Sequence, residues 1–370
     1  MGLRFAKVAA LAVLFSVVIG CGGSTQVSSS GSSYSFDYAN LLQSGALFVA
    51  VGDGVKSAAG TAGINLKTYN NNYPSAETAL SNAQLMVQDK PDVIIDYNAV
   101  AGIGDSIGKK FNDAKIPCIA VNVPIKGCAW FNLVNSELGT DTANAVIPIM
   151  KSKGWTGSDT VVILLQSAAA GPEVNDCIRY FYVTVSHSVP GFTQANPSDI
   201  TAQTTKIGDS GWQLEGGGQL DSSYTAVKNA LQAIPASKHI VLYSINDDSV
   251  LGGWRAISEA HRESNSLVAG LGSDEESRTQ LRTNPQWVAE GEIFPGMWGE
   301  YLMAMGVAIK KGEKAPGLTK TPQVVMTKDT IDKYFKPGSD QPLSLPALSS
   351  EDQYLKGVGI LQKFHNIQGL

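Results

Sequence analysis

Short apolar runs alternate with helical stripes along most of the chain, and this alternation restricts its fold more than any other feature. Apolar residues recur at helical spacing through residues 76–87, 103–114 and 174–185, while runs such as DVII, TVVILL and HIVLY are typical of buried strands. Strands joined by helices form mainly parallel sheets covered on both faces. About ten or eleven strands are too many for one compact sheet. The sequence therefore predicts an α/β protein with two doubly wound, Rossmann-like lobes.

Composition and charge exclude several classes of function. The chain has 370 residues, of which 43% are hydrophobic and 16% charged, so it has enough apolar residues to form real cores. Its formal net charge of −5 disfavours nucleic acid, which requires a basic surface. No Cys-x-x-Cys motif is present, and the four histidines, His187, His239, His261 and His365, are scattered. We therefore expect no metal site and no cofactor.

The N-terminus carries an export signal. Arg4 and Lys7 precede an apolar run, Val8 to Ile19, that is too short to span a bilayer. Gly20 and Cys21 follow, and then a stretch rich in Ser and Gly, so the segment resembles a bacterial lipoprotein signal. The resemblance implies that residues 1–20 are removed, that Cys21 is lipidated and that residues 21–33 form a flexible tether. The alternative is an ordinary secretory signal with an incidental cysteine.

Three further cysteines leave the pairing open. In an exported protein a disulfide is possible, and Cys118 and Cys128 are the closest pair in sequence. Because the number is odd, at least one thiol stays free, and Cys177 is the third candidate.

Polar side chains gather where the predicted strands end. The run IVLYS leads directly into Asn246, Asp247 and Asp248. Ligands of parallel sheets bind just beyond the carboxyl ends of the strands, so we interpret these residues as the lip of a binding cleft. Asp96, Asn98, Asn122 and Gln166 occupy equivalent positions. The alternative for each is a helix N-cap, which the same residue types favour.

The segment SINDDSVLGGWRAI resembles the Asn-Asp-x-x-Ala-x-Gly-x-x-x-Ala segment of the ribose/galactose-type periplasmic binding proteins, the substrate-binding subunits of sugar ABC importers. LFVAVGDGVKSAA resembles their first helix, and VMTKDTIDKYF their C-terminal strand and short helix. The resemblance covers most of residues 34–336 and implies two lobes joined by three hinge strands. We expect an N-terminal lobe of residues 34–136 plus 296–322 and a C-terminal lobe of 137–295 plus 323–336. Residues 337–370 would form a surface strap ending in a short helix.

The resemblance also implies a set of ligand-binding residues. With the strand-end residues Asp96 and Asn98, the predicted set is Asn40, Gln43, Phe48, Asn122, Asn175, Trp212, Asn246, Asp274 and Trp298. Two charged positions of the family's site have become Asn and Val here, because Asn122 stands where an Asp is frequent and Val123 where an Arg follows it. Asn175 stands where the family often uses another Arg. A polyol can still bind to amides and rings. Trp298 has helix core as its alternative, and the loop SGWQLEGGGQLDSS is expected to be longer than usual.

These observations predict a membrane-anchored substrate-binding lipoprotein of an ABC importer, on the extracytoplasmic side. It would close around a sugar or sugar-like polyol and deliver it, as a monomer without enzymatic activity, to an ABC permease and its ATPase. Alternatives are an extracytoplasmic sensor and a binder of a nucleoside or quorum signal. A remote alternative is a secreted serine hydrolase that uses Ser106 of the GDSIG motif, which would require a strand running directly into the serine.

Overall fold

The computed structural model describes residues 34–370 apart from Ala101. The predicted signal segment 1–20, Cys21 and the tether 21–33 lie outside the described residues. Within the described part, the strands form one sheet of six and one of seven. None of the described helices is both long enough and apolar enough to cross a membrane.

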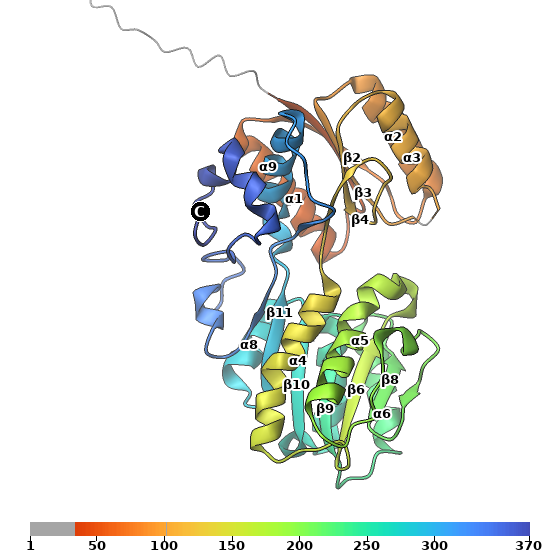
Figure 1. The fold of residues 1–370 in the computed structure, drawn as a ribbon. Helices are drawn as coiled ribbons and strands as arrows, with labels where there is room; N and C mark the ends of the chain where they lie inside the picture. Colours follow the sequence, from red (N-terminus) through yellow and green to blue (C-terminus); the bar gives the residue numbers. More distant parts are fainter. Residues whose placement is uncertain (1–33, 101) are drawn as a thin grey trace, which may run out of the picture. The chain divides into compact units, whose positions relative to one another are not determined.

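The first sheet is parallel throughout, with strand order β12-β5-β4-β3-β1-β2. Its strands are β1 (Ser35–Asn40), β2 (Asn65–Asn70), β3 (Val93–Asn98), β4 (Cys118–Asn122), β5 (Ala129–Asn132) and β12 (Thr319–Lys320). Helices α2 (Ala76–Asp89) and α3 (Gly104–Asp113) cover one face, and α1 (Ala46–Ala62) and α9 (Trp298–Lys310) cover the other (Figure 1). Both faces of β3 are buried as a result, which explains its continuous aliphatic run Val93–Ile95.

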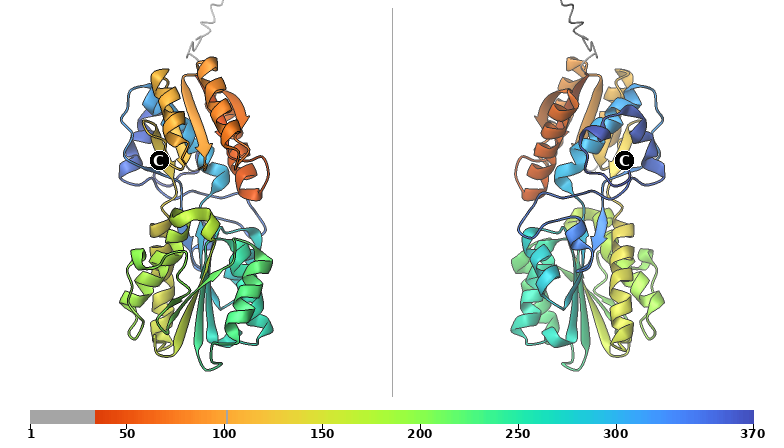
Figure 2. Two further views of the ribbon diagram at one scale, coloured as in Figure 1. Left: turned by 90° about the vertical axis from the view of Figure 1, so that its right-hand side faces the viewer. Right: turned by 90° about the vertical axis from the view of Figure 1, so that its left-hand side faces the viewer.

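The second sheet has strand order β13-β11-β10-β9-β6-β8-β7 and is parallel except at its two edges. Its strands are β6 (Thr160–Gln166), β7 (Lys206–Ile207), β8 (Gly211–Glu215), β9 (His239–Ser244), β10 (Ser266–Leu271), β11 (Trp287–Glu292) and β13 (Val324–Met326). Figure 2 shows α4 (Asn135–Ser152) and α5 (Gly171–Ser188) on one face, and α6 (Leu220–Leu231) and α7 (Asp247–Glu259) on the other. Helix α8 (Glu275–Thr283) packs against β11.

The prediction of two doubly wound, mainly parallel lobes is confirmed. The segment predicted as one long loop after residue 209 instead contains β8, which pairs with β6 from Gly211 to Glu215. Trp212 and Leu214 alternate with polar residues, which is a strand signal. The run of glycines that begins at Gly216 is typical of a loop, and for this reason the strand was not predicted. The short helix predicted near Tyr354 is a 3-10 turn, Glu351–Val358, followed by a second one at Leu361–Lys363.

The C-terminal segment, residues 337–370, is well packed although it has little regular structure. Leu345, Leu355 and Leu361 are fully buried. Asn366 donates to Glu300 of α9 over 2.8 Å, and Lys363 donates to the carbonyl of Ala62 at the end of α1 over 2.7 Å. At its other end, Arg278 of α8 forms an ion pair with Asp340. The segment therefore connects the helices of both sheets.

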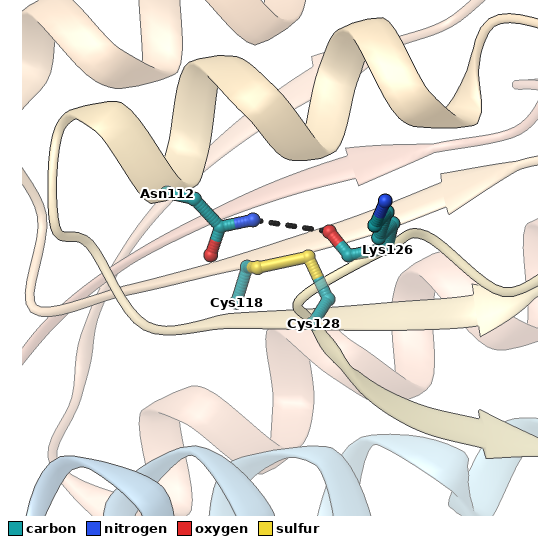
Figure 3. The surroundings of a disulfide bond; sticks show 4 residues. All are labelled: Asn112, Cys118, Lys126 and Cys128. Carbon is teal, nitrogen blue, oxygen red and sulfur yellow. Dashed lines mark hydrogen bonds between the residues drawn. A yellow bond between two sulfur atoms is a disulfide. The ribbon is translucent and has the colours of Figure 1, made fainter.

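A disulfide joins Cys118, at the start of β4, to Cys128, in the turn before β5 (Figure 3). Asn112 at the end of α3 supports the same turn, because its amide donates to the carbonyl of Lys126 over 3.0 Å. The remaining cysteine in the described part, Cys177, is free and buried within α5. The bridge thus fastens two neighbouring strands at their amino ends.

Helices α1 and α9 cross so closely that only glycine fits at the contact. A Cβ atom on Gly54 would lie 2.1 Å from the carbonyl oxygen of Gly296, and one on Gly299 would lie 2.4 Å from that of Gly54. Backbone atoms cannot move aside as a flexible side chain would. This crossing sets where α9, and with it Trp298, lies against the first sheet.

Replacing Gly54 by alanine should therefore lower the free energy of unfolding by about 2 kcal/mol, because the added methyl group overpacks a rigid contact. Gly60 lies in the same helix with open space around its Cβ position. Gly60→Ala is the matched control and should stabilise the protein by up to about 1 kcal/mol through helix propensity alone. Urea unfolding of both variants measures the difference, and equal effects would contradict the close crossing.

Candidate functional site

Amides line the carboxyl edge of the first sheet. Each of its first five strands ends in asparagine: Asn40, Asn70, Asn98, Asn122 and Asn132. Parallel pairing places these ends at one edge, with Asn40 opposite Asn70 and Asn98 opposite Asn122. We call this edge the first rim. It presents hydrogen-bonding groups without charge at its strand ends, apart from Lys320 of the short strand β12.

Two of these amides shape the loops around them. Asn40 donates to the carbonyls of Leu42 (2.8 Å) and Phe48 (2.9 Å), and its carbonyl oxygen accepts from Tyr38 over 2.7 Å. Asn98 accepts from the amide of Val100 over 3.1 Å. Because these side-chain groups already have partners in the protein, both residues position the loops. Gln43, in the loop that Asn40 organises, is exposed.

Asp96 lies within the first sheet, with 1% of its surface exposed. One carboxyl oxygen accepts from the amide of Asn71 over 2.7 Å, and Asn82 of α2 donates to Asn71 over 3.0 Å. Burial raises the pKa of Asp96 to about 7. This network anchors the loop after β2 to the sheet and to α2.

An aromatic cluster lies next to the first rim. Tyr97 of β3 contacts Phe48 with ring centroids 6.0 Å apart and Trp298 at 6.3 Å, and Trp298 meets Phe131 at 5.9 Å. Trp298 is 2% exposed, and its indole donates to the carbonyl of Ile293 over 2.7 Å, which matches the helix-core alternative. Phe48 is only half-buried. Phe48 is therefore the most exposed ring of this cluster.

The predicted residues of the second sheet act as local supports. Asn175 holds the loop after β6, because it accepts from the amide of Ser167 (3.1 Å) and donates to the carbonyl of Gly171 (2.6 Å). Asn246 caps α7 by accepting from the amide of Ser249 over 3.1 Å, and Asp274 caps α8 in the same way. Asn246 also donates to Gly218 over 2.9 Å, which ties β9 to the loop after β8. Neither Asp247 nor Asp248 is the cap.

Three carboxyl groups are buried at the carboxyl edge of the second sheet, which we call the second rim. Asp247, Glu290 and Glu292 are at most 7% exposed. Burial raises the pKa of Asp247 to about 6 and that of Glu292 to about 8, and burial together with the neighbouring Asp247 carboxylate raises the pKa of Glu290 well above its usual range. Glycines make room for them, since a Cβ on Gly272 would lie 2.7 Å from the Asp247 carboxylate. The prediction omitted Glu290 and Glu292, although glutamates at alternate positions in the apolar run WVAEGEIF were a visible signal.

Glu173 is a further residue that the prediction omitted. It lies in the first turn of α5, and its carboxylate accepts from Asn132 of β5 (2.7 Å) and Asn135 at the start of α4 (3.4 Å). Burial raises its pKa, whereas these two amide donors oppose the rise. Burial raises the pKa of Tyr97, and the negative charge of Glu173 adds to this rise. The two rims therefore meet at Glu173.

Trp212 lies apart from these contacts, whereas Asn122 belongs to the first rim. Trp212 is the second residue of β8 and pairs with Ile163, whereas Glu215 at the carboxyl end pairs with Gln166. It borders a cavity of about 160 Å³ together with Lys206 and Lys238, near the amino end of the sheet. Asn122 has a left-handed backbone, φ 72°, and its carbonyl accepts from the Trp130 indole over 2.8 Å. Trp212 is thus not brought together with the other predicted residues.

The structure offers no support for an elbow at Ser106. That residue is exposed in the first turn of α3, and β3 has already ended at Asn98, six residues before Gly104 begins the helix. Among residues 34–370 without Ala101, no group of three or more His, Cys, Asp or Glu side chains is arranged to hold a metal ion.

A family model described as "Periplasmic binding protein domain" matches residues 38–314, and the chain belongs to this family. One similar solved structure is an ABC transporter solute binding protein from Mycobacterium smegmatis with bound glycerol, with 18% identity over 84% of this chain and 99% of that one, at a TM-score of 0.65. Another is a galactofuranose binding protein, with 18% identity over 88% and 99% at a TM-score of 0.62. No curated protein matches the sequence.

A third structure is the periplasmic binding component of the arabinose ABC transporter from Shewanella sp. ANA-3, bound to alpha and beta-L-arabinofuranose. It is 17% identical over 80% of this chain and 93% of that one, at a TM-score of 0.62. At these identities the likeness concerns the fold. The resemblance to sugar-binding periplasmic proteins of ABC transporters is thereby confirmed at the level of family and fold.

The raised pKa values predict that stability decreases with pH. In the folded state Asp96, Asp247 and Glu292 keep protons that the unfolded chain has released above its ordinary carboxyl pKa values near 4, so the free energy of unfolding should fall as pH rises toward 8. Acids whose pKa is lowered, such as Asp92, titrate below this window. Urea unfolding should give a value about 1–3 kcal/mol lower at pH 8 than at pH 5.5.

Glu292→Gln should remove part of this dependence, because the amide cannot ionise. Glu313, which is exposed beyond the end of α9, provides the matched control Glu313→Gln, and it should leave the pH profile unchanged. A wild-type protein that is equally stable or more stable at pH 8 would contradict the assignment of buried, protonated carboxyl groups.

Proposed function

We propose that this chain is the substrate-binding lipoprotein of an ABC importer and that it binds a sugar or sugar-like polyol between its two rims. The family supports a binding role, and the fold is that of sugar-binding solute receptors. Binding would proceed by closure about the segments that connect the two sheets, since a ligand that contacts both rims favours the closed state. The ligand would then pass to a permease driven by its ATPase.

The observation that carries this proposal is the pair of polar rims beside an aromatic cluster. Sugar hydroxyls need hydrogen-bond partners when they are buried, and a sugar ring face packs against an aromatic ring. The first rim supplies amides and the half-buried ring of Phe48, and the second supplies carboxyl groups and the amide of Gln166. Both edges are built from the carboxyl ends of parallel strands, the usual place for ligands in such sheets.

The ligand class is supported by what related folds bind. Solved structures similar to this chain are described with beta-D-fucofuranose, with L-arabinofuranose and with D-allose. We therefore place five- and six-carbon sugars, in both ring forms, first among the candidate ligands. Simple polyols follow, because one similar structure holds glycerol.

Anchoring at Cys21 is part of the same proposal. The sequence around Cys21 has the lipoprotein pattern, and the Cys118–Cys128 disulfide is consistent with folding in an oxidising compartment. A receptor held beside its permease would capture the ligand outside the cytoplasm.

Calorimetry against a panel of pentoses, hexoses, polyols and nucleosides tests the binding site. We expect at least one sugar to bind, and Phe48→Ala to weaken that binding about tenfold because the ligand loses an aromatic contact. Trp212→Ala is the comparison, since Trp212 lies toward the amino end of the second sheet and its loss should change affinity by less than about twofold. The reverse ranking of the two variants would place the ligand elsewhere, and binding of nucleosides alone would exclude the sugar.

Anchoring is tested separately with Cys21→Ser. Lipidation needs the sulfur, so the variant should move from the membrane fraction to the soluble fraction after cell lysis, while its affinity for the ligand stays unchanged. Membrane association that survives the substitution would show that another element holds the protein at the membrane.

A further inference from the structure

The C-terminal segment, residues 337–370, forms a fourth connection between the two sheets. Within residues 34–336 the chain passes from one sheet to the other three times, between β5 and β6, between β11 and β12, and between β12 and β13. The C-terminal segment then follows the last strand of the second sheet and ends against α1 and α9 of the first. It lies beyond residues 38–314, which the family model matches. The fourth connection is therefore an addition to the matched domain.

Helix α8 holds the beginning of this connection on the side of the second sheet. Arg282 of α8 donates to the carbonyl of Phe335 over 2.8 Å and forms an ion pair with Asp332 at 3.1 Å. Arg278 of the same helix pairs with Asp340, and its guanidinium lies 4.5 Å from the centroid of the Phe335 ring. Because α8 packs against β11, these contacts fasten residues 332–340 to the second sheet.

Leu343 and Ser344 continue the same attachment. The backbone amide of Leu343 donates to the carbonyl of Tyr334 over 2.6 Å. The hydroxyl of Ser344 donates to the carbonyl of Lys333 over 2.9 Å. Both acceptors belong to the turn that α8 holds, so the C-terminal segment stays with the second sheet as far as Ser344.

Leu345 belongs to the opposite attachment. Its backbone amide donates to the carbonyl of Asn366 over 2.6 Å, and its carbonyl accepts from the backbone amide of Gln368 over 3.1 Å. Asn366 is fixed in turn, because its side chain donates to Glu300 of α9 over 2.8 Å. Leu345 itself is fully buried. The C-terminal segment is therefore bound to the helices of the first sheet from Leu345 onward.

The two attachments meet without any spare chain between them. Ser344 and Leu345 are consecutive, and consecutive Cα atoms are only about 3.8 Å apart. The side chain of Gln368 also donates to the hydroxyl of Ser344 over 3.2 Å, which closes the junction. A motion that separates α8 from α9 must therefore break hydrogen bonds on one side of this junction or withdraw Leu345 from the core.

We infer that the C-terminal segment restrains the opening of the two lobes and that its pivot is the junction between Ser344 and Leu345. A restrained protein samples fewer open arrangements before a ligand arrives, so closure around the ligand costs less conformational entropy. This consequence for binding rests on the proposed function. The restraint itself is a property of the protein without ligand and can be measured without one.

Pairs of spin labels on the full chain measure the opening by pulsed electron paramagnetic resonance. Glu77, in the first turn of α2 after β2, and Asp221, in the first turn of α6 after β8, are both exposed. Strands β2 and β8 lie at or near the sheet edges opposite β12 and β13, where the chain crosses. Labels at Glu77→Cys and Asp221→Cys should therefore report the separation of the lobes, while the buried thiol of Cys177 stays unlabelled.

A site for a sequence-specific protease, inserted between Ser344 and Leu345, releases the restraint. The insertion should lengthen the mean distance between the labels by about 5 Å or more and broaden its distribution, because a flexible stretch of about seven residues spans about 15 Å. Cutting the folded protein at this site should broaden the distribution further. The matched control carries the same site between Glu313 and Lys314, in the exposed loop after α9, and should keep the original distance before and after cutting.

The chain without an insertion provides a second test. Its distance distribution should be as narrow as that of a reference pair within one lobe, Glu77→Cys with Lys56→Cys, which is exposed on α1. A broader distribution than the reference would overturn the inference even if the variant with the insertion fails to fold. Distances that stay the same after insertion and cutting at Ser344, or that change equally in the control, would also overturn it. Failure of the whole sugar panel would overturn the proposed function and leave the measured restraint standing.

Discussion

Burial of parallel strands on both faces is the constraint on which this molecule depends. Val93–Ile95 and all of β6 are covered by helices above and below, so each strand can present polar groups only where it ends. Right-handed crossovers bring those ends to one edge of each sheet. The amides of the first rim and the acids of the second are therefore direct consequences of the same packing that forms the cores.

The fold class could be predicted because the spacing of apolar residues along the sequence indicates which faces of each helix and strand are buried. The pattern of buried faces in turn determines the fold class. Runs such as TVVILLQ coincide with β6, Thr160–Gln166, residue for residue. The exceptions have physical reasons. β8 is a short strand near a sheet edge, followed by a glycine run, and β2, Asn65–Asn70, alternates weakly because much of it is exposed. Short strands near a sheet edge bury little surface, so their sequences show only a weak pattern of apolar residues.

The site was harder to predict, because one residue type serves two purposes. Asparagine is suited to a ligand hydroxyl and equally to a backbone amide in a cap or turn. Asn40, Asn175 and Asn246 bond to nearby backbone, and nothing in a single sequence distinguishes that use from ligand contact. Glu173 was not predicted because its contact is long-range, whereas those of the asparagines are local. Its partner Asn132 is 41 residues away, so the contact forms only once both sheets have formed.

The disulfide lies at the amino ends of β4 and β5, the opposite edge of the sheet from Asn122 and Asn132. The disulfide and the amides of the first rim thus lie at opposite edges of one sheet. A reducing environment would act on the yield of native protein, because it would open the short loop that the disulfide closes, and it would leave the amides of the first rim chemically unchanged.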